Sequence, residues 1–261
     1  MEIEWKDEIL YQDLVKWDSR LKQEAPFFNE LIKSINKPKS RILDVSCGTG
    51  DHLVMFAKWG FDGVGIDISE QNIAEARKIA SINKVVDKVD FIVGDMLKLE
   101  ETLKEEKFDF IYCIGNTFSI FTPEERAKII NEMINLLNKE GKVVIQVVNY
   151  LSHTNDSEWF YNPNISRGKN EEIQYHVRIM EWIVSKEKIR MYVLKTQQVA
   201  RECDDFTLHN KTTEFFVIQQ KEYEKLAEKN NLNLNIYGDY QKNSFEENGS
   251  NDLVVILEKC D

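Results

Sequence analysis

Apolar residues gather in five short runs that are separated by segments with helical periodicity. The runs are rich in β-branched and aromatic residues, and they are Arg41–Val45, Gly63–Asp67, Val89–Val93, Phe108–Cys113 and Lys142–Val148. Because these runs are apolar on both faces, they are typical of parallel strands buried under helices. The alternation predicts an α/β fold with a doubly wound sheet, whose ligands bind outside the carboxyl ends of the strands.

Two of the intervening segments begin with helix-capping residues. Ser69 precedes a segment with apolar residues at intervals of three to four positions. Thr122 is followed by a proline at the first helical position and by an acidic residue at the third, and an apolar stripe then extends toward Gly141. These signals predict a helix in each segment.

The segments on either side of this pattern differ from it. Residues 11–35 predict one or two helices with a break at Pro26, so residues 1–40 are expected to form a helical cap. Residues 41–150 form the predicted α/β core. Residues 217–261 are expected to return to its sheet through a helix over Glu222–Asn230 and strands over Leu232–Tyr237 and Leu253–Leu257.

The strand–helix alternation stops after Asn149. Tyr175–Val184 and Ile189–Gln198 predict two strands joined by a short turn, and Thr213–Ile218 could add a third. We expect residues 151–216 to form an antiparallel β insertion that acts as a lid over the ligand, since long excursions from an α/β core are commonly functional.

Composition and charge limit the classes of molecule that the protein is expected to bind. The chain has 45 acidic and 34 basic residues and a net charge of −11, which disfavours a nucleic-acid partner. The four cysteines have no CxxC spacing, so we expect neither a disulfide framework nor a metal site. No apolar run is long enough to span a bilayer and the amino terminus lacks a signal-peptide core, so we expect a cytoplasmic protein with a small-molecule substrate.

The segment Ser46-Cys47-Gly48-Thr49-Gly50 joins the first predicted strand to a helix. Gly48 and Gly50 permit positive φ angles and allow a ligand to approach the backbone closely. The third glycine of a dinucleotide-binding GxGxxG motif would fall on Leu53, so a nicotinamide cofactor fits poorly. Taken alone, the segment is equally consistent with a tight structural turn.

Polar residues also follow the next three predicted strands. Asp67 ends the second strand, 19 residues after Gly48, where a carboxylate can accept hydrogen bonds from ribose hydroxyls. Asp95 ends the third, where it can hold an exocyclic amine while Met96 packs against a purine. The fourth strand leads into Gly115-Asn116-Thr117. Each carboxylate taken singly is more simply a helix cap or a solvated charge, but their occurrence at consecutive strand ends predicts an adenosine pocket.

With these residues the sequence resembles the class I S-adenosylmethionine-dependent methyltransferases. Asp44, Gly48 and Gly50 match the family's first motif, in which Ser46 replaces the first glycine. The resemblance implies a Rossmann-like, seven-stranded methyltransferase sheet, S-adenosylmethionine as cofactor and S-adenosylhomocysteine as product. It implies that the following residues bind the cofactor: Tyr11, Trp17, Arg20, Ser46, Gly48, Gly50, Asp67, Ile68, Asp95, Met96, Cys113 and Ile114.

A narrower resemblance links the chain to glycine and glycine/sarcosine N-methyltransferases and their relatives. It rests on Trp17-Asp18-Ser19-Arg20, Cys113-Ile114-Gly115-Asn116-Thr117, Asn149-Tyr150 and Gly238-Asp239-Tyr240. The residues predicted to orient the methyl acceptor are Asn116, Asn149, Tyr150, His176 and Tyr240. The two tyrosines could equally be packed aromatic residues, and His176 is more simply structural.

One departure from the subgroup concerns the acceptor. In the glycine-methylating enzymes an arginine precedes the Asn-Tyr pair and binds the amino-acid carboxylate, whereas this chain has Val148 there. Valine cannot form a bidentate pair with a carboxylate, which argues against glycine or sarcosine, although Arg178, Arg190 or Arg201 of the insertion could supply the charge instead. The sequence therefore predicts methyl transfer to a small molecule, preferably to nitrogen. The alternatives are a small-molecule O-methyltransferase and a cofactor-binding sensor without turnover.

Overall fold

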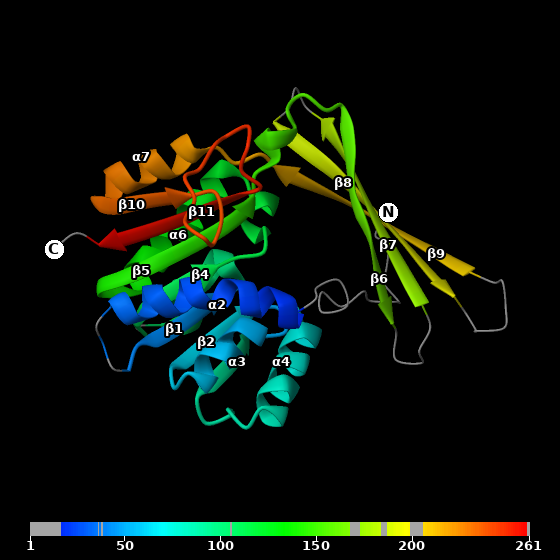
Figure 1. Cartoon of the computed structure of the whole chain (residues 1–261). Helices are drawn as coiled ribbons and strands as arrows, with labels where there is room; N and C mark the ends of the chain where they lie inside the picture. The colour runs from blue at the N-terminus through cyan, green and yellow to red at the C-terminus, as the bar shows by residue number, and fades with distance from the viewer. Residues whose placement is uncertain are drawn as a thin grey trace. The chain divides into compact units, whose positions relative to one another are not determined.

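The structure is a computed structural model that describes residues 17–35, 37, 39–104, 106–167, 173–183, 187–198 and 206–259. For residues 162–167, 173–176, 195–198 and 206–210 only the backbone is described. The chain divides into two compact units (Figure 1). The larger is Leu21–Thr154 with Phe216–Asp261, and the smaller is Asn155–Phe215 with Met1–Arg20.

The larger unit contains a seven-stranded sheet in the order β10-β11-β5-β4-β1-β2-β3. Its strands pair in parallel except β11, which is antiparallel to both of its neighbours. The strands are β1 (Arg41–Val45), β2 (Asp62–Asp67), β3 (Val89–Val93), β4 (Phe108–Cys113), β5 (Leu137–Val148), β10 (Leu232–Tyr237) and β11 (Asp252–Lys259). The predicted doubly wound sheet is confirmed, and three of the five predicted core strands have the predicted bounds.

Helices cover both faces of this sheet (Figure 1). The helices on each face pack against the sheet through a separate hydrophobic cluster. One face packs against α5 (Leu99–Leu103), α6 (Pro123–Leu136) and α7 (Gln220–Asn230), through residues such as Leu99, Ile130 and Tyr223. The other face packs against α2 (Trp17–Ser34), α3 (Asp51–Lys58) and α4 (Glu70–Ile82), through residues such as Phe28, Leu53 and Ile73. None of the helices in the described part of the chain is long and apolar enough to cross a membrane.

The predicted helix starts are confirmed. The Ser69 hydroxyl accepts a hydrogen bond from the Asn72 backbone N–H at the start of α4. Thr122 and Glu125 form a reciprocal capping box at the start of α6. Both helices therefore begin where side-chain oxygens satisfy the first free N–H groups.

Two predicted helix ends are wrong. The helix α2 continues through Pro26, because Phe27 and Phe28, which follow it, are buried against the core and hold the helix in place. The helix α6 ends at Leu136 and not near Gly141. Leu137 already has extended backbone and pairs with Phe108, so β5 begins five residues before the predicted strand.

The smaller unit contains an antiparallel sheet in the order β6-β7-β8-β9. Its strands are β6 (Glu158–Arg167), β7 (Ile173–Ile183), β8 (Lys188–Gln198) and β9 (Phe206–Phe216). The predicted antiparallel insertion is confirmed, but the sequence analysis missed β6 and placed the start of the last strand too late. In β6 an Asn-Pro-Asn segment interrupts the apolar alternation, and the register shifts between Tyr161 and Asn164. The role of the insertion as a lid remains a prediction.

Candidate functional site

The predicted cofactor residues of the core follow four strands that are neighbours in the sheet, in the order β4-β1-β2-β3. Asp44 pairs with Gly65 on β2 and with Tyr112 on β4, and Asp67 pairs with Val93 on β3. Because these strands are parallel and in register, their carboxyl ends meet at one edge of the sheet. The structure thus brings the predicted strand-end residues of the core to a common edge.

The glycine-bearing loop after β1 has a tightly constrained backbone. Ser46, Gly48 and Gly50 all have positive φ angles, of 65°, 54° and 75°. Gly50 is the N-cap of α3, and a Cβ atom there would lie 2.5 Å from the ring of Phe91. Glycine is therefore required at position 50 both by its backbone conformation and by the space available.

Asp67 holds this loop against the end of β2. Its carboxylate is 7% exposed and accepts hydrogen bonds from the backbone N–H groups of Gly48 and Ser69, both at 2.9 Å. The side-chain amide of Asn72 donates a third bond, at 3.2 Å, to the same oxygen as Ser69. A carboxylate can accept about four hydrogen bonds, two on each oxygen. The Oδ2 atom, which accepts from Gly48, therefore retains capacity for one further donor.

The edge next to Asp67 combines a carboxylate with exposed apolar surface. Asp95 accepts a bond of 2.9 Å from the Leu97 backbone N–H and caps the short helix η1 (Met96–Lys98). The Ile68 side chain is 74% exposed, whereas Met96 is buried in the core beneath α5. This edge therefore offers hydrogen-bond acceptors beside an apolar contact surface, which suits a nucleoside.

The thiols beside the edge are buried and protonated. Burial raises the pKa of Cys47 and of Cys113, and the negative charges of Asp44 and Asp67 raise it further. A protonated thiol is a poor nucleophile. Cys113 and the neighbouring Ile114 are buried at the end of β4, and their contact with a cofactor stays a prediction.

The turn after β4 begins at Asn116, whose φ of 75° is unusual for a residue with a side chain. Its Oδ1 atom accepts bonds from the Val148 backbone N–H, at 3.0 Å, and from the Ser119 hydroxyl, at 2.8 Å. Its Nδ2 group donates to the Tyr150 hydroxyl at 2.8 Å. Two predicted acceptor residues, Asn116 and Tyr150, are therefore hydrogen-bonded to one another.

Asn149 and Tyr240 have structural contacts. The Asn149 side chain donates 2.8 Å bonds to the carbonyls of Glu247 and Ser250 and thus holds the loop before β11. The Tyr240 ring packs against Phe27 and Phe28 of α2, with centroids 5.2 and 5.7 Å away. A role of either residue toward the acceptor stays a prediction.

Four predicted residues remain, and they lie in the amino-terminal segment and in β7. Tyr11 lies outside the described residues, as does the side chain of His176, although the backbone of His176 belongs to β7. Trp17 and Arg20 lie in the first turn of α2, with the guanidinium 5.4 Å from the centre of the indole ring. For these four residues the predicted roles stay predictions.

The sequence analysis did not identify the contacts of three polar side chains in the core. The Gln146 side chain accepts from the Gly115 backbone N–H at 2.8 Å and donates to Asp252 at 2.7 Å, which fixes the turn after β4. The signal for it was a single polar residue within the apolar run of β5. Glu24 and His52 are both buried, and a 2.5 Å hydrogen bond between Oε2 of Glu24 and Nε2 of His52 joins α2 to α3. They are 28 residues apart in sequence, and no local pattern pairs them.

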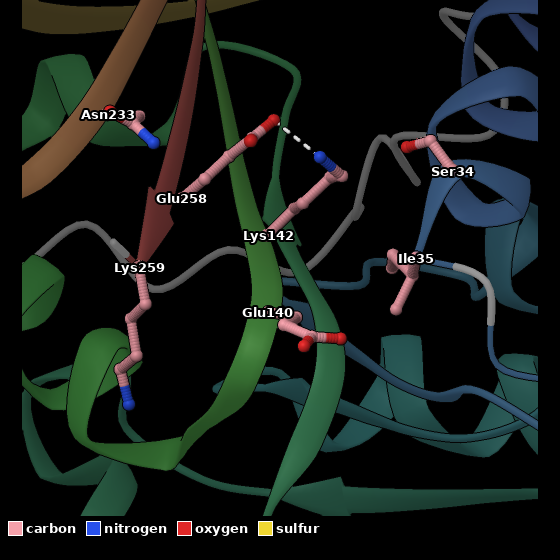
Figure 2. A pocket seen from close by; sticks show the side chains of 7 residues that line it. All are labelled: Ser34, Ile35, Glu140, Lys142, Asn233, Glu258 and Lys259. Carbon is pink, nitrogen blue, oxygen red and sulfur yellow. Dashed lines mark hydrogen bonds and ion pairs between the residues drawn. The ribbon is translucent and has the colours of Figure 1, made fainter. Parts of the chain in front are cut away.

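A hollow of about 280 Å³ lies away from this edge. It opens near the start of β5, at the opposite end of that strand from Asn149, and the ion pair between Lys142 and Glu258, with N···O at 2.5 Å, crosses it (Figure 2). None of the predicted site residues lines it. Within the described residues there is also no group of three or more His, Cys, Asp or Glu side chains that could hold a metal.

Comparisons with known proteins agree with this geometry. A protein-family model described as "Methyltransferase domain" matches residues 36–231. The chain is 35% identical over 159 residues to a glycine/sarcosine N-methyltransferase from Halorhodospira halochloris, covering 58% of this chain and 56% of that protein. The chain thus spans about half the length of the curated relatives it matches.

Solved structures share the fold over nearly the whole chain. An S-adenosylmethionine-dependent methyltransferase from Clostridium acetobutylicum has a TM-score of 0.76 at 17% identity, with 96% of each chain covered. The amino pentose methyltransferase CalS10 from Micromonospora echinaspora, solved with bound S-adenosylmethionine, has a TM-score of 0.71 at 16% identity. That match covers 99% of this chain and 100% of CalS10.

Proposed function

Because the chain belongs to the methyltransferase-domain family, we propose that it transfers a methyl group from S-adenosylmethionine to a nitrogen atom of a small molecule. The observation that carries this proposal is the alignment of Ser46, Asp67, Asp95 and Asn116 at the ends of four adjacent parallel strands. Ligands of open α/β sheets bind at such an edge. The fold shared with S-adenosylmethionine-dependent methyltransferases supports the same cofactor.

The residues at this edge fit an adenosine. The Oδ2 atom of Asp67 has room for one ribose hydroxyl, since three of about four acceptor positions on the carboxylate are already used. The exposed Ile68 side chain supplies an apolar surface for a purine, and Asp95 supplies an acceptor for its amine. The positive φ angles of Gly48 and Gly50 leave the backbone open to close approach.

Bound S-adenosylmethionine supplies an activated methyl group with a neutral leaving group, so the protein's task is chiefly positioning. Well-oriented intramolecular reactions gain roughly 7 to 11 kcal/mol over their bimolecular counterparts. In our proposal the Asn116–Tyr150 pair orients the acceptor by hydrogen bonding. An amine acceptor must be neutral to attack, so its proton leaves to a base or to solvent before methyl transfer.

Several features favour an amine without a carboxylate close to the reacting nitrogen. Val148 cannot pair with a carboxylate, and its backbone N–H is bonded to Asn116. Among the arginines of the insertion that could bind a carboxylate instead, Arg190 is already paired with Glu181 and Glu214. The similarity to N-methyltransferases supports nitrogen as the acceptor atom.

The test is a panel of acceptors incubated with purified protein and S-adenosylmethionine, with S-adenosylhomocysteine release measured by mass spectrometry. The panel contains amino sugars, alkylamines, glycine, sarcosine and phenols. We expect release with amines that lack a neighbouring carboxylate and little with glycine or sarcosine. Release with phenols alone would overturn the assignment to nitrogen, and cofactor binding without any release would favour a sensor. Failure to bind S-adenosylhomocysteine would overturn the proposal.

A further inference from the structure

The glycine-bearing loop and the turn after β4 are joined by two hydroxyl groups. The Oγ atom of Ser46 lies 3.2 Å from the Oγ1 atom of Thr117, and either can be the donor. The two residues follow β1 and β4, which are adjacent in the sheet. This hydrogen bond therefore connects the cofactor side of the proposed site directly to the acceptor side.

Both loops have a left-handed backbone conformation at this contact, which is unfavourable for Ser46 and better tolerated by Asn116. Ser46 has a φ of 65° and Asn116, the residue before Thr117, has a φ of 75°. Residues other than glycine rarely adopt such angles, and they persist where the surroundings determine them, most often at functional sites. Ser46 also stands where the family's first motif has glycine, so its side chain is retained at a position where it is costly.

The turn after β4 is fixed at its other contacts. Asn116 is bonded to the Val148 backbone, and the Phe121 carbonyl, which follows η2 (Thr117–Ile120), accepts a 2.5 Å bond from Arg126. Arg126 is 1% exposed and forms two further bonds, of 2.7 and 2.6 Å, with Glu222. The turn is thus anchored through Asn116 and Phe121, and the bond from Thr117 to Ser46 joins it to the glycine-bearing loop.

The hydroxyl pair retains hydrogen-bonding capacity toward a ligand. Two hydroxyl groups provide two hydrogens, and the bond between them uses one. Both side chains are partly exposed, and among the described residues neither hydroxyl has a second protein partner. The remaining O–H can therefore donate to a group that binds at the sheet edge.

We propose that Ser46 and Thr117 are positioning residues whose hydroxyl contact couples cofactor binding to the conformation of the acceptor-side turn 116–121. The coupling rests on the proposed cofactor site. A bound ligand that accepts the remaining O–H favours the bonded arrangement of the two loops, and that differential interaction shifts the turn toward one conformation. Bound cofactor thereby stabilises the turn from which Asn116 orients the acceptor.

The test is amide hydrogen exchange over residues 116–121, measured by mass spectrometry with and without S-adenosylhomocysteine. The variant Thr117→Val removes the hydroxyl while keeping the shape of the side chain, and Thr117→Ser is the matched control that keeps the hydroxyl. The variant Ser46→Gly removes the partner hydroxyl and relieves the positive-φ strain. Calorimetric binding and thermal unfolding are measured for each protein.

We expect the ligand to slow exchange over residues 116–121 in the wild type and in Thr117→Ser, and to have no such effect in Thr117→Val or Ser46→Gly. Affinity for S-adenosylhomocysteine should fall about five-fold in Thr117→Val, the equivalent of one neutral hydrogen bond, and stay within about two-fold in Thr117→Ser. Ser46→Gly should lose the ligand response over residues 116–121 although its unfolding temperature rises. If Ser46 had only a structural role, the variant would keep the ligand response.

Two results would overturn the coupling. One is an unchanged ligand response over residues 116–121 in both Thr117→Val and Ser46→Gly. The other is wild-type protein that binds S-adenosylhomocysteine without any change in exchange over this turn. Wild-type protein that does not bind the ligand at all is a different result, because it contradicts the proposed function itself.

Discussion

Replacing Asp67 with asparagine tests the two roles assigned to this carboxylate, which are to hold the glycine-bearing loop and to bind a ribose hydroxyl. In the structure it accepts bonds from two backbone N–H groups and from Asn72, and one position on Oδ2 remains for a ligand. In Asp67→Asn one oxygen becomes an NH₂ group. If the remaining oxygen still accepts the hydrogen bonds from Ser69 and Asn72, the new NH₂ group faces the Gly48 N–H. Two hydrogen-bond donors then face each other, and the Gly48 N–H has no acceptor.

The expected cost follows from these three bonds. Leaving the Gly48 N–H without an acceptor costs about 1–3 kcal/mol, and replacing charged by neutral acceptors for the other two costs about 1 kcal/mol more. The larger unit should thus be destabilised by about 2–4 kcal/mol, which lowers its unfolding temperature by roughly 5–15 °C. Affinity for S-adenosylhomocysteine should fall about 10- to 150-fold, the equivalent of one hydrogen bond of 1.5–3 kcal/mol to a charged group.

The assay is isothermal titration calorimetry at a temperature where circular dichroism shows the variant to be folded. The matched control is Asp62→Asn at the opposite end of β2, where the carboxylate is exposed and lies 3.7 Å from Lys88. The control should bind like the wild type, because an exposed ion pair contributes about 0–1 kcal/mol. An Asp67→Asn variant that binds S-adenosylhomocysteine within about two-fold of the wild type would refute the assignment of Asp67 to the ligand.

Three further predictions concern stability. Arg126→Met should destabilise the protein by about 2–3 kcal/mol in urea unfolding, because it removes a buried guanidinium that donates to the partly exposed Glu222 and to the Phe121 carbonyl, and a loss under about 1 kcal/mol would contradict this. Gly50→Ala should cost about 1–3 kcal/mol more than Gly60→Ala in the same assay, because both positions have positive φ but only at Gly50 does an added Cβ meet a phenylalanine ring. Burial raises the pKa of Asp239, but hydrogen bonds from neighbouring loop groups outweigh burial and lower it below the usual 3.8. The ionised Asp239 carboxylate therefore contributes its full stabilisation above the ordinary pKa of 3.8, and this contribution is lost as the pH falls through the lowered pKa. Between about pH 2 and 5 the unfolding temperature should therefore fall less steeply in Asp239→Asn than in the wild type.

Much of the core could be predicted because its strands are buried on both faces. The runs of β1 and β4 are buried over nearly their whole length, whereas β3 lies at the edge of the sheet, is only partly buried, and was predicted from its β-branched and aromatic residues. The capping residues Ser69 and Thr122 mark helix starts through local hydrogen bonds. The predicted α/β fold and the resemblance to methyltransferases are confirmed. Both depend on signals within a few residues of one another.

The features that were missed depend on contacts between distant segments. The helix α2 continues through Pro26 because Phe28 is buried by the core, and β6 persists through an Asn-Pro-Asn segment because β7 pairs with it. At the candidate site the sequence placed Asp67 correctly at a strand end. It could not show that three acceptor positions on its carboxylate are already used by the protein.

The central claim is that an adenosine binds at the carboxyl edge of β1, β2 and β3. A crystal structure of the protein with S-adenosylhomocysteine tests it most directly. We expect a ribose hydroxyl within hydrogen-bonding distance of the Asp67 carboxylate and the purine against Ile68, close to Asp95. Electron density for the ligand at another place, or an edge that stays empty at saturating ligand, would contradict the claim.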